Sequence, residues 1–134
     1  MVNVSILYPF KEGGRFDLEY YLKTHMPQSI EKLRPALRGV SIEHGLSTAG
    51  SDAPPAFIVI CQLRFDSAEA FLEAFSPHAA FLQGDIKNYT DIDPVIQFSA
   101  ASCPLTTSTG LKTRKEGIGN KEIAHLRLFR SRSS

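Results

Sequence analysis

Three of the four histidines in this 134-residue sequence stand among apolar residues, and imidazole is the side chain best suited to acid–base chemistry near neutral pH. His25 and His78 each lie on the apolar face of a helical pattern, and His44 lies on the apolar face of a strand pattern. If both helices pack on the sheet face that carries His44, the three imidazoles line one cavity. For each histidine, a hydrogen-bonded core or surface position is the alternative interpretation.

A cavity of this kind is suited to general acid–base catalysis. We predict His25 and His78 as the catalytic residues. Substrate contacts are predicted for Tyr8, Tyr21, His44, Phe81 and Tyr89. A three-histidine metal site is an alternative, but the sequence has no close-spaced H-x-x-x-H pair and no clear carboxylate ligand, so we expect neither a metal nor another cofactor.

The first histidine belongs to a helix that follows a strand and a glycine loop. Residues 2–8 alternate apolar and polar as a strand does, and Asp17 is placed to cap the helix after the loop KEGGR. The residue before a proline is disfavoured in helical geometry. We therefore expect Met26 to mark a kink and Pro27 to begin a second helical piece.

The rest of the fold is predicted from the same patterns. The segments VSIEHGLS and AFIVICQLRF read as strands, and the second has apolar residues on both faces. Asp66 and Glu69 have the spacing of a capping box at the start of a second helix. Ser76 is expected to cap a fresh helical piece that begins at Pro77, and PVIQFS reads as the last strand.

The resulting order is βαββαβ over residues 1 to about 100. This order predicts an α+β, ferredoxin-like fold with an antiparallel four-stranded sheet in the order 4-1-3-2 and helices on one face. The open face of the sheet, apolar on the third strand, needs a partner. We expect the same face of a second copy to cover it, which would form a dimeric α+β barrel.

Charge divides the chain into two parts. Residues 1–100 hold eight Lys and Arg against twelve Asp and Glu, a net charge of −4, whereas residues 101–134 hold seven against two, a net charge of +5. The composition of residues 101–134 predicts a flexible basic tail, with a nucleic-acid or membrane arm as the alternative. It lacks the aromatic spacing and the sustained apolar face of such arms, so we expect neither partner. No basic stretch leads into a long apolar run, which predicts a cytoplasmic protein.

Two long blocks resemble the EthD family, named for a protein of ethyl tert-butyl ether degradation. They are YPFKEGGRFDLEYYLKTHMP and PHAAFLQGDIKNYTDIDPVIQFS, with GVSIEHGL between them, and the resemblance covers residues 1 to about 100. It implies a ferredoxin-like dimeric α+β barrel and a setting of small-molecule oxidation or degradation. The shared residues, which carry no assigned roles, are Asp17, Tyr20, Tyr21, His25, Pro27, His78, Asp85, Tyr89 and Asp91.

Two functional hypotheses follow, together with a third possibility. The first is a small, cofactor-free enzyme, an oxidoreductase by family association or a lyase or isomerase, that acts on an apolar, aromatic or oxygenated metabolite between sheet and helices. The second is a non-catalytic module that binds a hydrophobic ligand or supports a partner oxygenase. A haem or metal protein is the third possibility.

Overall fold

The computed structural model describes residues 1–101, and it confirms the predicted order of elements. The strands are β1 (Val2–Pro9), β2 (Gly39–His44), β3 (Phe57–Phe65) and β4 (Val95–Ala100). The helical segments are α1 (Leu18–Tyr20), a π-helical turn (Tyr21–His25), α2 (Met26–Leu33), α3 (Ala68–Phe75), a 3₁₀ turn (Ser76–His78), α4 (Ala79–Gly84) and a second 3₁₀ turn (Ile86–Asn88). The predicted basic tail lies outside the described residues, apart from Ala101.

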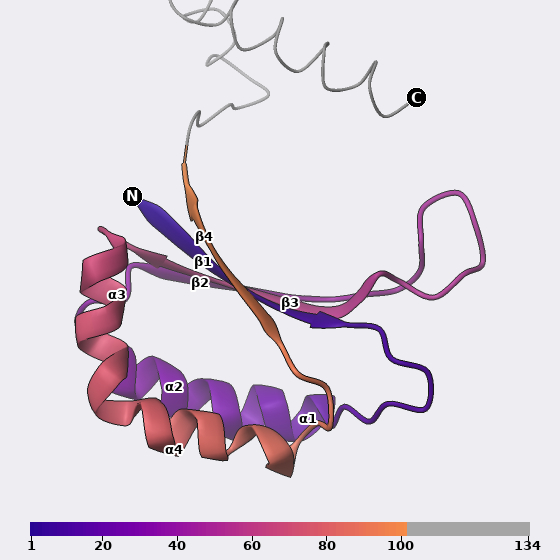
Figure 1. Cartoon of the computed structure of the whole chain (residues 1–134), viewed down its shortest axis with the longest axis horizontal. Helices are drawn as coiled ribbons and strands as arrows, with labels where there is room; N and C mark the ends of the chain where they lie inside the picture. The colour runs from indigo at the N-terminus through magenta and orange to yellow at the C-terminus, as the bar shows by residue number, and fades with distance from the viewer. Residues whose placement is uncertain (102–134) are drawn as a thin grey trace, which may run out of the picture. The chain divides into compact units, whose positions relative to one another are not determined.

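The strands form one antiparallel sheet in the order β2-β3-β1-β4, as predicted. Both helical layers lie on the same side of this sheet, which is the ferredoxin-like α+β arrangement (Figure 1). The central strands β1 and β3 pair from Val2 with Phe65 to Tyr8 with Val59. This register places the alternating apolar residues of both strands on the face that the helices cover.

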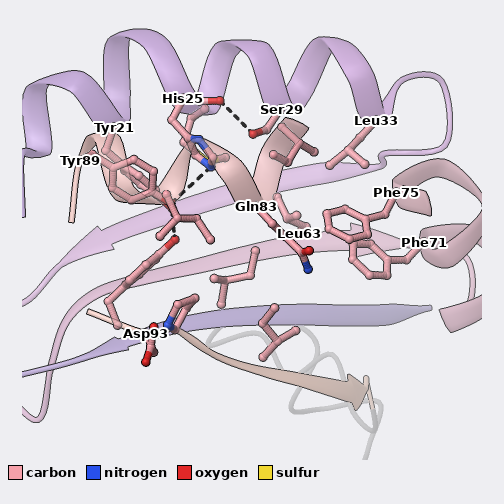
Figure 2. Close-up of a pocket in the computed structure, with 17 residues that line it drawn as sticks. Tyr21, His25, Ser29, Leu33, Leu63, Phe71, Phe75, Gln83, Tyr89 and Asp93 are labelled. Atoms are coloured by element: carbon pink, nitrogen blue, oxygen red, sulfur yellow. Dashed lines mark hydrogen bonds between the residues drawn. The ribbon is translucent and has the colours of Figure 1, made fainter. Parts of the chain in front are cut away.

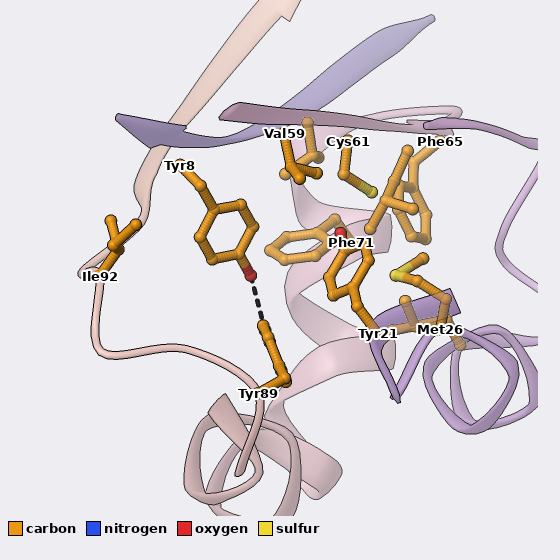
Figure 3. Close-up of a cluster of buried hydrophobic side chains, with 12 residues drawn as sticks. Tyr8, Tyr21, Met26, Val59, Cys61, Phe65, Phe71, Tyr89 and Ile92 are labelled. Atoms are coloured by element: carbon orange, nitrogen blue, oxygen red, sulfur yellow. Dashed lines mark hydrogen bonds between the residues drawn. The ribbon is translucent and has the colours of Figure 1, made fainter. Parts of the chain in front are cut away.

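The core fills the space between the covered face and the helices (Figure 3). Val4, Cys61 and Phe65 of the sheet are completely buried, and Tyr21 and Leu33 reach them from the helical layer. A large apolar side chain contributes about 1.5–3 kcal/mol to folding when it is fully buried. The core is therefore anchored on the two central strands, β1 and β3.

The open face of the sheet is apolar at one end only. Val95, Leu7 and Ile60 lie side by side in a row across β4, β1 and β3, and the next row consists of Gln97, Ser5 and Gln62. Arg64 continues the polar part of β3. The apolar character predicted for both faces of β3 therefore holds on the open face only around Ile58 and Ile60.

A second helical piece, α2, begins at Met26, one residue before the predicted start at Pro27, but Met26 itself keeps helical geometry, contrary to the prediction. Met26 has helical dihedral angles, φ −67° and ψ −43°, and its N–H donates to the carbonyl of Tyr21 in a π-helical turn. In an α-helix the ring of Pro27 would collide with the carbonyl four residues earlier, which belongs to Lys23. The wider π turn accommodates this ring, so α1, the π turn and α2 form one continuous helical segment (Figure 1).

The caps of the second helical segment also differ from the prediction. The hydroxyl of Ser67, rather than the carboxylate of Asp66, accepts the N–H of Ala70 at 3.1 Å. Asp66 instead accepts two hydrogen bonds from the guanidinium of Arg38, because β2 brings that arginine alongside. Ser76 does not cap a new piece, since its hydroxyl donates back to the carbonyl of Leu72. The predicted cap at Asp17 is confirmed, with the N–H of Tyr20 3.0 Å from its carboxylate.

Candidate acid–base site

A cavity of about 370 Å³ lies between the sheet and the helical layer, within the range of small-molecule sites (Figure 2). The residues at its polar end are Tyr8, Tyr21, His25 and Tyr89. Its apolar lining is formed by Ile6, Met26, Leu33, Leu63, Phe71, Phe75, Leu82, Ile86, Pro94 and Ile96. Ser29, Gln83 and Asp93 complete the lining. The cavity therefore offers an apolar body with hydrogen-bonding groups at a few points.

At the polar end, three side chains that are distant in sequence form a hydrogen-bonded chain. The hydroxyls of Tyr8 and Tyr89 are 2.6 Å apart, and the Tyr89 hydroxyl is 3.4 Å from Nε2 of His25. Figure 3 shows the link between the two tyrosines. All three residues are buried, so the chain is shielded from bulk water.

The other ring nitrogen of His25 contacts a buried carboxylate. Nδ1 of His25 is 2.8 Å from Oδ2 of Asp85. Oδ1 of the same carboxylate accepts hydrogen bonds from the Tyr20 hydroxyl and the Asn88 amide, both at 2.8 Å. A carboxylate on Nδ1 fixes the orientation of an imidazole and stabilises the imidazolium that forms when Nε2 takes a proton.

Two local features place these groups. The π turn puts Tyr21 and His25 four residues apart on the cavity side of the helix, with their rings stacked at a centroid distance of 5.6 Å. The segment that carries Asp85 and Tyr89 is tied to the start of this helix, because the N–H of Asp17 donates to the carbonyl of Tyr89 at 2.7 Å. The rings of His25 and Tyr89 consequently lie 4.6 Å apart.

Burial and hydrogen bonding set the charges at this site. Burial lowers the pKa of His25 below its ordinary value, and Asp85 offsets part of this effect. Burial alone would raise the pKa of Asp85, but the hydrogen bonds from Asn88, His25 and Tyr20 outweigh it and leave that pKa below the ordinary value. At neutral pH the pair is thus a neutral imidazole beside a carboxylate, with the proton on Nδ1 and the lone pair of Nε2 on the side of the Tyr89 hydroxyl.

The tyrosine hydroxyls stay protonated at neutral pH. Burial raises the pKa of Tyr8 to about 12 and also raises the pKa of Tyr89. Either hydroxyl can donate in the Tyr8–Tyr89 hydrogen bond. When Tyr89 donates to Tyr8, the proton of Tyr8 is free to reach a ligand oxygen and Nε2 of His25 is free to accept a proton. The site can therefore act as a base and as a hydrogen-bond donor at the same time.

The structure brings together four of the seven residues predicted from the sequence: Tyr8, Tyr21, His25 and Tyr89. The described lining does not include His44, His78 or Phe81, so the predicted convergence of three histidines is wrong. His44 is exposed at the end of the edge strand β2, and His78 is half-buried in the 3₁₀ turn. Phe81 is 50% exposed and faces the ammonium group of Lys32 at 4.5 Å, because Leu82, the next residue of α4, takes the cavity side.

Several polar contributors to the site were not predicted as site residues, among them Asp85, Tyr20, Asn88 and Gln83. Asp85 and Tyr20 belong to the residues shared with the EthD family, and that resemblance was the available signal for them. The spacing of Asp85, Asn88 and Tyr89 in GDIKNY fits a turn that presents polar groups, but it does not identify His25 as their partner. Gln83 left no signal, since an amide next to the end of a helix is common on protein surfaces.

Residues 1–101 contain no cluster of three or more His, Cys, Asp or Glu side chains able to hold a metal ion. Among the same residues, no helix is long and apolar enough to cross a membrane.

The fold and the cavity define a ferredoxin-like α+β protein with a buried Tyr–Tyr–His–Asp chain. The comparison with solved structures finds an EthD-like protein from Ralstonia eutropha JMP134 at 43% sequence identity. That match covers 78% of this chain and 95% of the other, with a TM-score of 0.75. This chain therefore belongs to the EthD family.

A more distant structure supports the fold alone. An ethyl tert-butyl ether degradation (EthD) family protein from Bacillus halodurans C-125 is 20% identical, with 76% of this chain and 99% of that chain covered and a TM-score of 0.54. No family model matches the chain, and no curated protein matches it. The family assignment consequently rests on the Ralstonia protein.

Proposed function

We propose that this protein is a small acid–base enzyme that moves a proton on an apolar, oxygen-bearing small molecule in the cavity. The observation that carries the proposal is the position of His25. One of its ring nitrogens is held by Asp85 at 2.8 Å, and the other lies 3.4 Å from the Tyr89 hydroxyl at the polar end of the cavity. When Tyr89 donates to Tyr8, Nε2 has a free lone pair and can act as a general base, while Asp85 orients the ring and stabilises the imidazolium.

The reaction that fits these groups is enolisation of a carbonyl compound. Nε2 of His25 takes the proton from the carbon next to the carbonyl, and the electron pair of that C–H bond forms a carbon–carbon double bond. The carbonyl π electrons move to the oxygen, which receives a hydrogen bond from Tyr8. Asp85 stabilises the imidazolium that results, and return of the proton to carbon or oxygen regenerates neutral His25.

The apolar lining supports this chemistry in two ways. Residues such as Phe71, Leu63 and Met26 exclude water from the body of the ligand, and a low dielectric strengthens the attraction between imidazolium and carboxylate. Tyr21 stacks on His25 and limits the rotation of its ring. Among the predicted substrate contacts, we propose that Tyr8, Tyr21 and Tyr89 serve this role.

The same first step would serve several reaction classes. After the enol forms, an isomerase returns the proton to a different atom, and a lyase eliminates a leaving group. A cofactor-free oxidoreductase would let molecular oxygen react with the enol. The oxidoreductase and degradative roles expected from the family resemblance are thus finer versions of this proposal. The non-catalytic module is the competing proposal, since the chain from Tyr8 to Asp85 would also orient a ligand without turnover.

The test is deuterium exchange into anthrone and tetralone in heavy water, followed by NMR. These ketones have acidic C–H bonds and an apolar ring body. We expect the protein to accelerate exchange and His25→Gln to lower the acceleration by at least about 100-fold, since a positioned base contributes about 10²–10⁴. Circular dichroism checks that the variant is folded.

His78→Gln is the matched control, because it makes the same change outside the cavity. It should leave exchange within about twofold of the unmodified protein. Equal losses in both variants would restore His78 as a catalytic residue and contradict the assignment of the base to His25 alone. Binding of the ketones without exchange would support the non-catalytic module instead.

We also propose that two copies associate through the open face of the sheet. The row Val95, Leu7 and Ile60 gives this face an apolar strip that water would otherwise contact. Light scattering should give the mass of a dimer, and Ile60→Asp should convert it to a monomer. A stable monomer for the unmodified chain would overturn this proposal and leave the acid–base proposal untouched.

A further inference from the structure

The charges along the cavity wall limit the ligands that it can hold. The described lining contains no lysine and no arginine, and its only residue with a formal charge is Asp93. A second carboxylate, Asp85, lies directly behind His25. A ligand carboxylate inside this cavity would lose its hydration without gaining a cationic partner, which is strongly unfavourable. The cavity therefore favours an uncharged ligand.

A second polar point lies on the solvent-open side of the cavity, since Gln83 belongs to the lining but is exposed. Gln83 projects from α4, and its amide lies between the His25 end and the Phe71–Phe75 end in Figure 2. Within residues 1–101 this exposed amide makes no side-chain hydrogen bond, whereas the hydroxyl of Ser29, another polar lining residue, donates to the carbonyl of His25 at 2.8 Å. Gln83 thus has both a donor and an acceptor available to a ligand.

The far end of the cavity is aromatic. The rings of Phe71 and Phe75 stack at a centroid distance of 5.2 Å and an interplanar angle of 16°. Phe98 of β4, which is not part of the described lining, packs on Phe71 with a centroid distance of 5.7 Å and an interplanar angle of 67°. Aromatic walls favour flat ring systems, because offset and edge-to-face contacts add to the burial of area.

From these three observations we infer that the ligand is an uncharged, flat ring compound with two oxygen substituents. One substituent lies at the Tyr8–Tyr89–His25 end and the other at the amide of Gln83. Gln83 is thereby a specificity-determining residue, because its amide hydrogen-bonds a second hydroxyl or carbonyl group and so increases the affinity for ligands that carry one. This inference rests on the proposed function of the cavity, and it narrows the substrate class of that site.

Three related probes test the inference: naphthol, the dihydroxynaphthalenes and the hydroxynaphthoates. They share one ring system and differ in a second substituent that is absent, neutral or charged. The chain contains no tryptophan, so naphthol fluorescence can be followed in the presence of the protein without tryptophan emission. We expect the best dihydroxynaphthalene isomer to bind about fivefold more tightly than naphthol, the gain of one hydrogen bond. We expect every hydroxynaphthoate to bind at least about tenfold more weakly than that isomer.

The variants are Gln83→Leu, which removes the amide at nearly constant volume, and Gln28→Leu, the same change on the outer side of α2. Gln83→Leu should abolish the preference for the second hydroxyl, and Gln28→Leu should retain it. A preference that survives Gln83→Leu, a hydroxynaphthoate that binds as tightly as the best dihydroxynaphthalene, or no binding of any probe would each overturn the inference.

The two proposals can fail separately. If deuterium exchange into anthrone depends on His25 while Gln83→Leu leaves the preference for dihydroxynaphthalene unchanged, the acid–base proposal is supported and the inferred substrate class is wrong. If Gln83 governs binding while His25→Gln leaves exchange unchanged, the reverse holds.

Discussion

Two helix breaks in this protein carry the same sequence feature and have different outcomes. In the first, His25 stands two residues before Pro27, and in the second, His78 directly follows Pro77. The first break is a π turn whose histidine is buried, lines the cavity and is hydrogen-bonded to Asp85. The second is a 3₁₀ turn whose histidine is half-buried and does not belong to the described lining.

The difference lies in the turn geometry and in the partner that each side chain meets. A π turn inserts an extra residue and keeps Tyr21 and His25 stacked on the inner side of the helix. A 3₁₀ turn is tighter and shifts the phase of the residues that follow, so Leu82 and Gln83, rather than His78 and Phe81, reach the cavity. A histidine beside a proline is therefore no site by itself. It becomes one where the chain supplies a buried carboxylate.

The largest expected effect is a difference in the free energy of unfolding between a variant at the first break and a variant at the second. Tyr21 is 1% exposed, and Tyr21→Ala should lower the free energy of unfolding by about 3–5 kcal/mol, the cost of removing a buried aromatic side chain. Phe81→Ala, after the second break, should cost at most about 1 kcal/mol, the value of an exposed cation–π contact. Denaturant unfolding measures both. Similar losses in the two variants would mean that the breaks are equally integrated into the core.

The next effect concerns the carboxylate that distinguishes the first break. Neutral His25 is the active base, so exchange should rise with pH through the pKa of His25, which lies below the ordinary value of about 6.5. Asp85 raises this pKa, so Asp85→Asn should move the acidic limb to still lower pH. It should also lower the plateau at least about tenfold, because the anion that stabilises the imidazolium is lost.

The control for that variant is Asp66→Asn, which removes a carboxylate from an exposed ion pair with Arg38. It should leave the pH profile in place and change stability by at most about 1 kcal/mol. NMR titration of the His25 imidazole checks the direction independently of turnover. An upward shift in Asp85→Asn would contradict the placement of the proton on Nδ1.

The smallest effect concerns the prolines themselves. Pro27→Ala restores a backbone N–H and removes the ring that disfavours an α-helical bond to Lys23, so the π turn should relax toward an α-helix. The NMR signals of the His25 ring should then shift, with a change in stability of about 1 kcal/mol or less. Pro77→Ala should not affect them. If neither variant moves the His25 signals, the π turn is maintained by the contacts of Tyr21 and His25 and not by the proline.

Much of the fold was predictable from the sequence because its signals are local. Period-two alternation identified β1, and the apolar stripes identified both helical segments, as the observed elements and the strand order confirm. The cap at Asp17 was also predicted, since the carboxylate and the N–H of Tyr20 are three residues apart. The cap at Ser67 was missed because Asp66 had an equally suitable spacing, and its distant partner Arg38 could not be read from that spacing.

Sequence patterns alone were sufficient to predict a βαββαβ sheet over residues 1 to about 100, with His25 on an apolar helix face. They could not show which histidine has a partner, because 60 residues separate His25 from Asp85 and 64 separate it from Tyr89. Backbone periodicity assigns each side chain to a face but does not give the helix phase after an irregular turn. Only the tertiary structure therefore shows that Gln83, rather than His78, lines the cavity and that His25 pairs with Asp85.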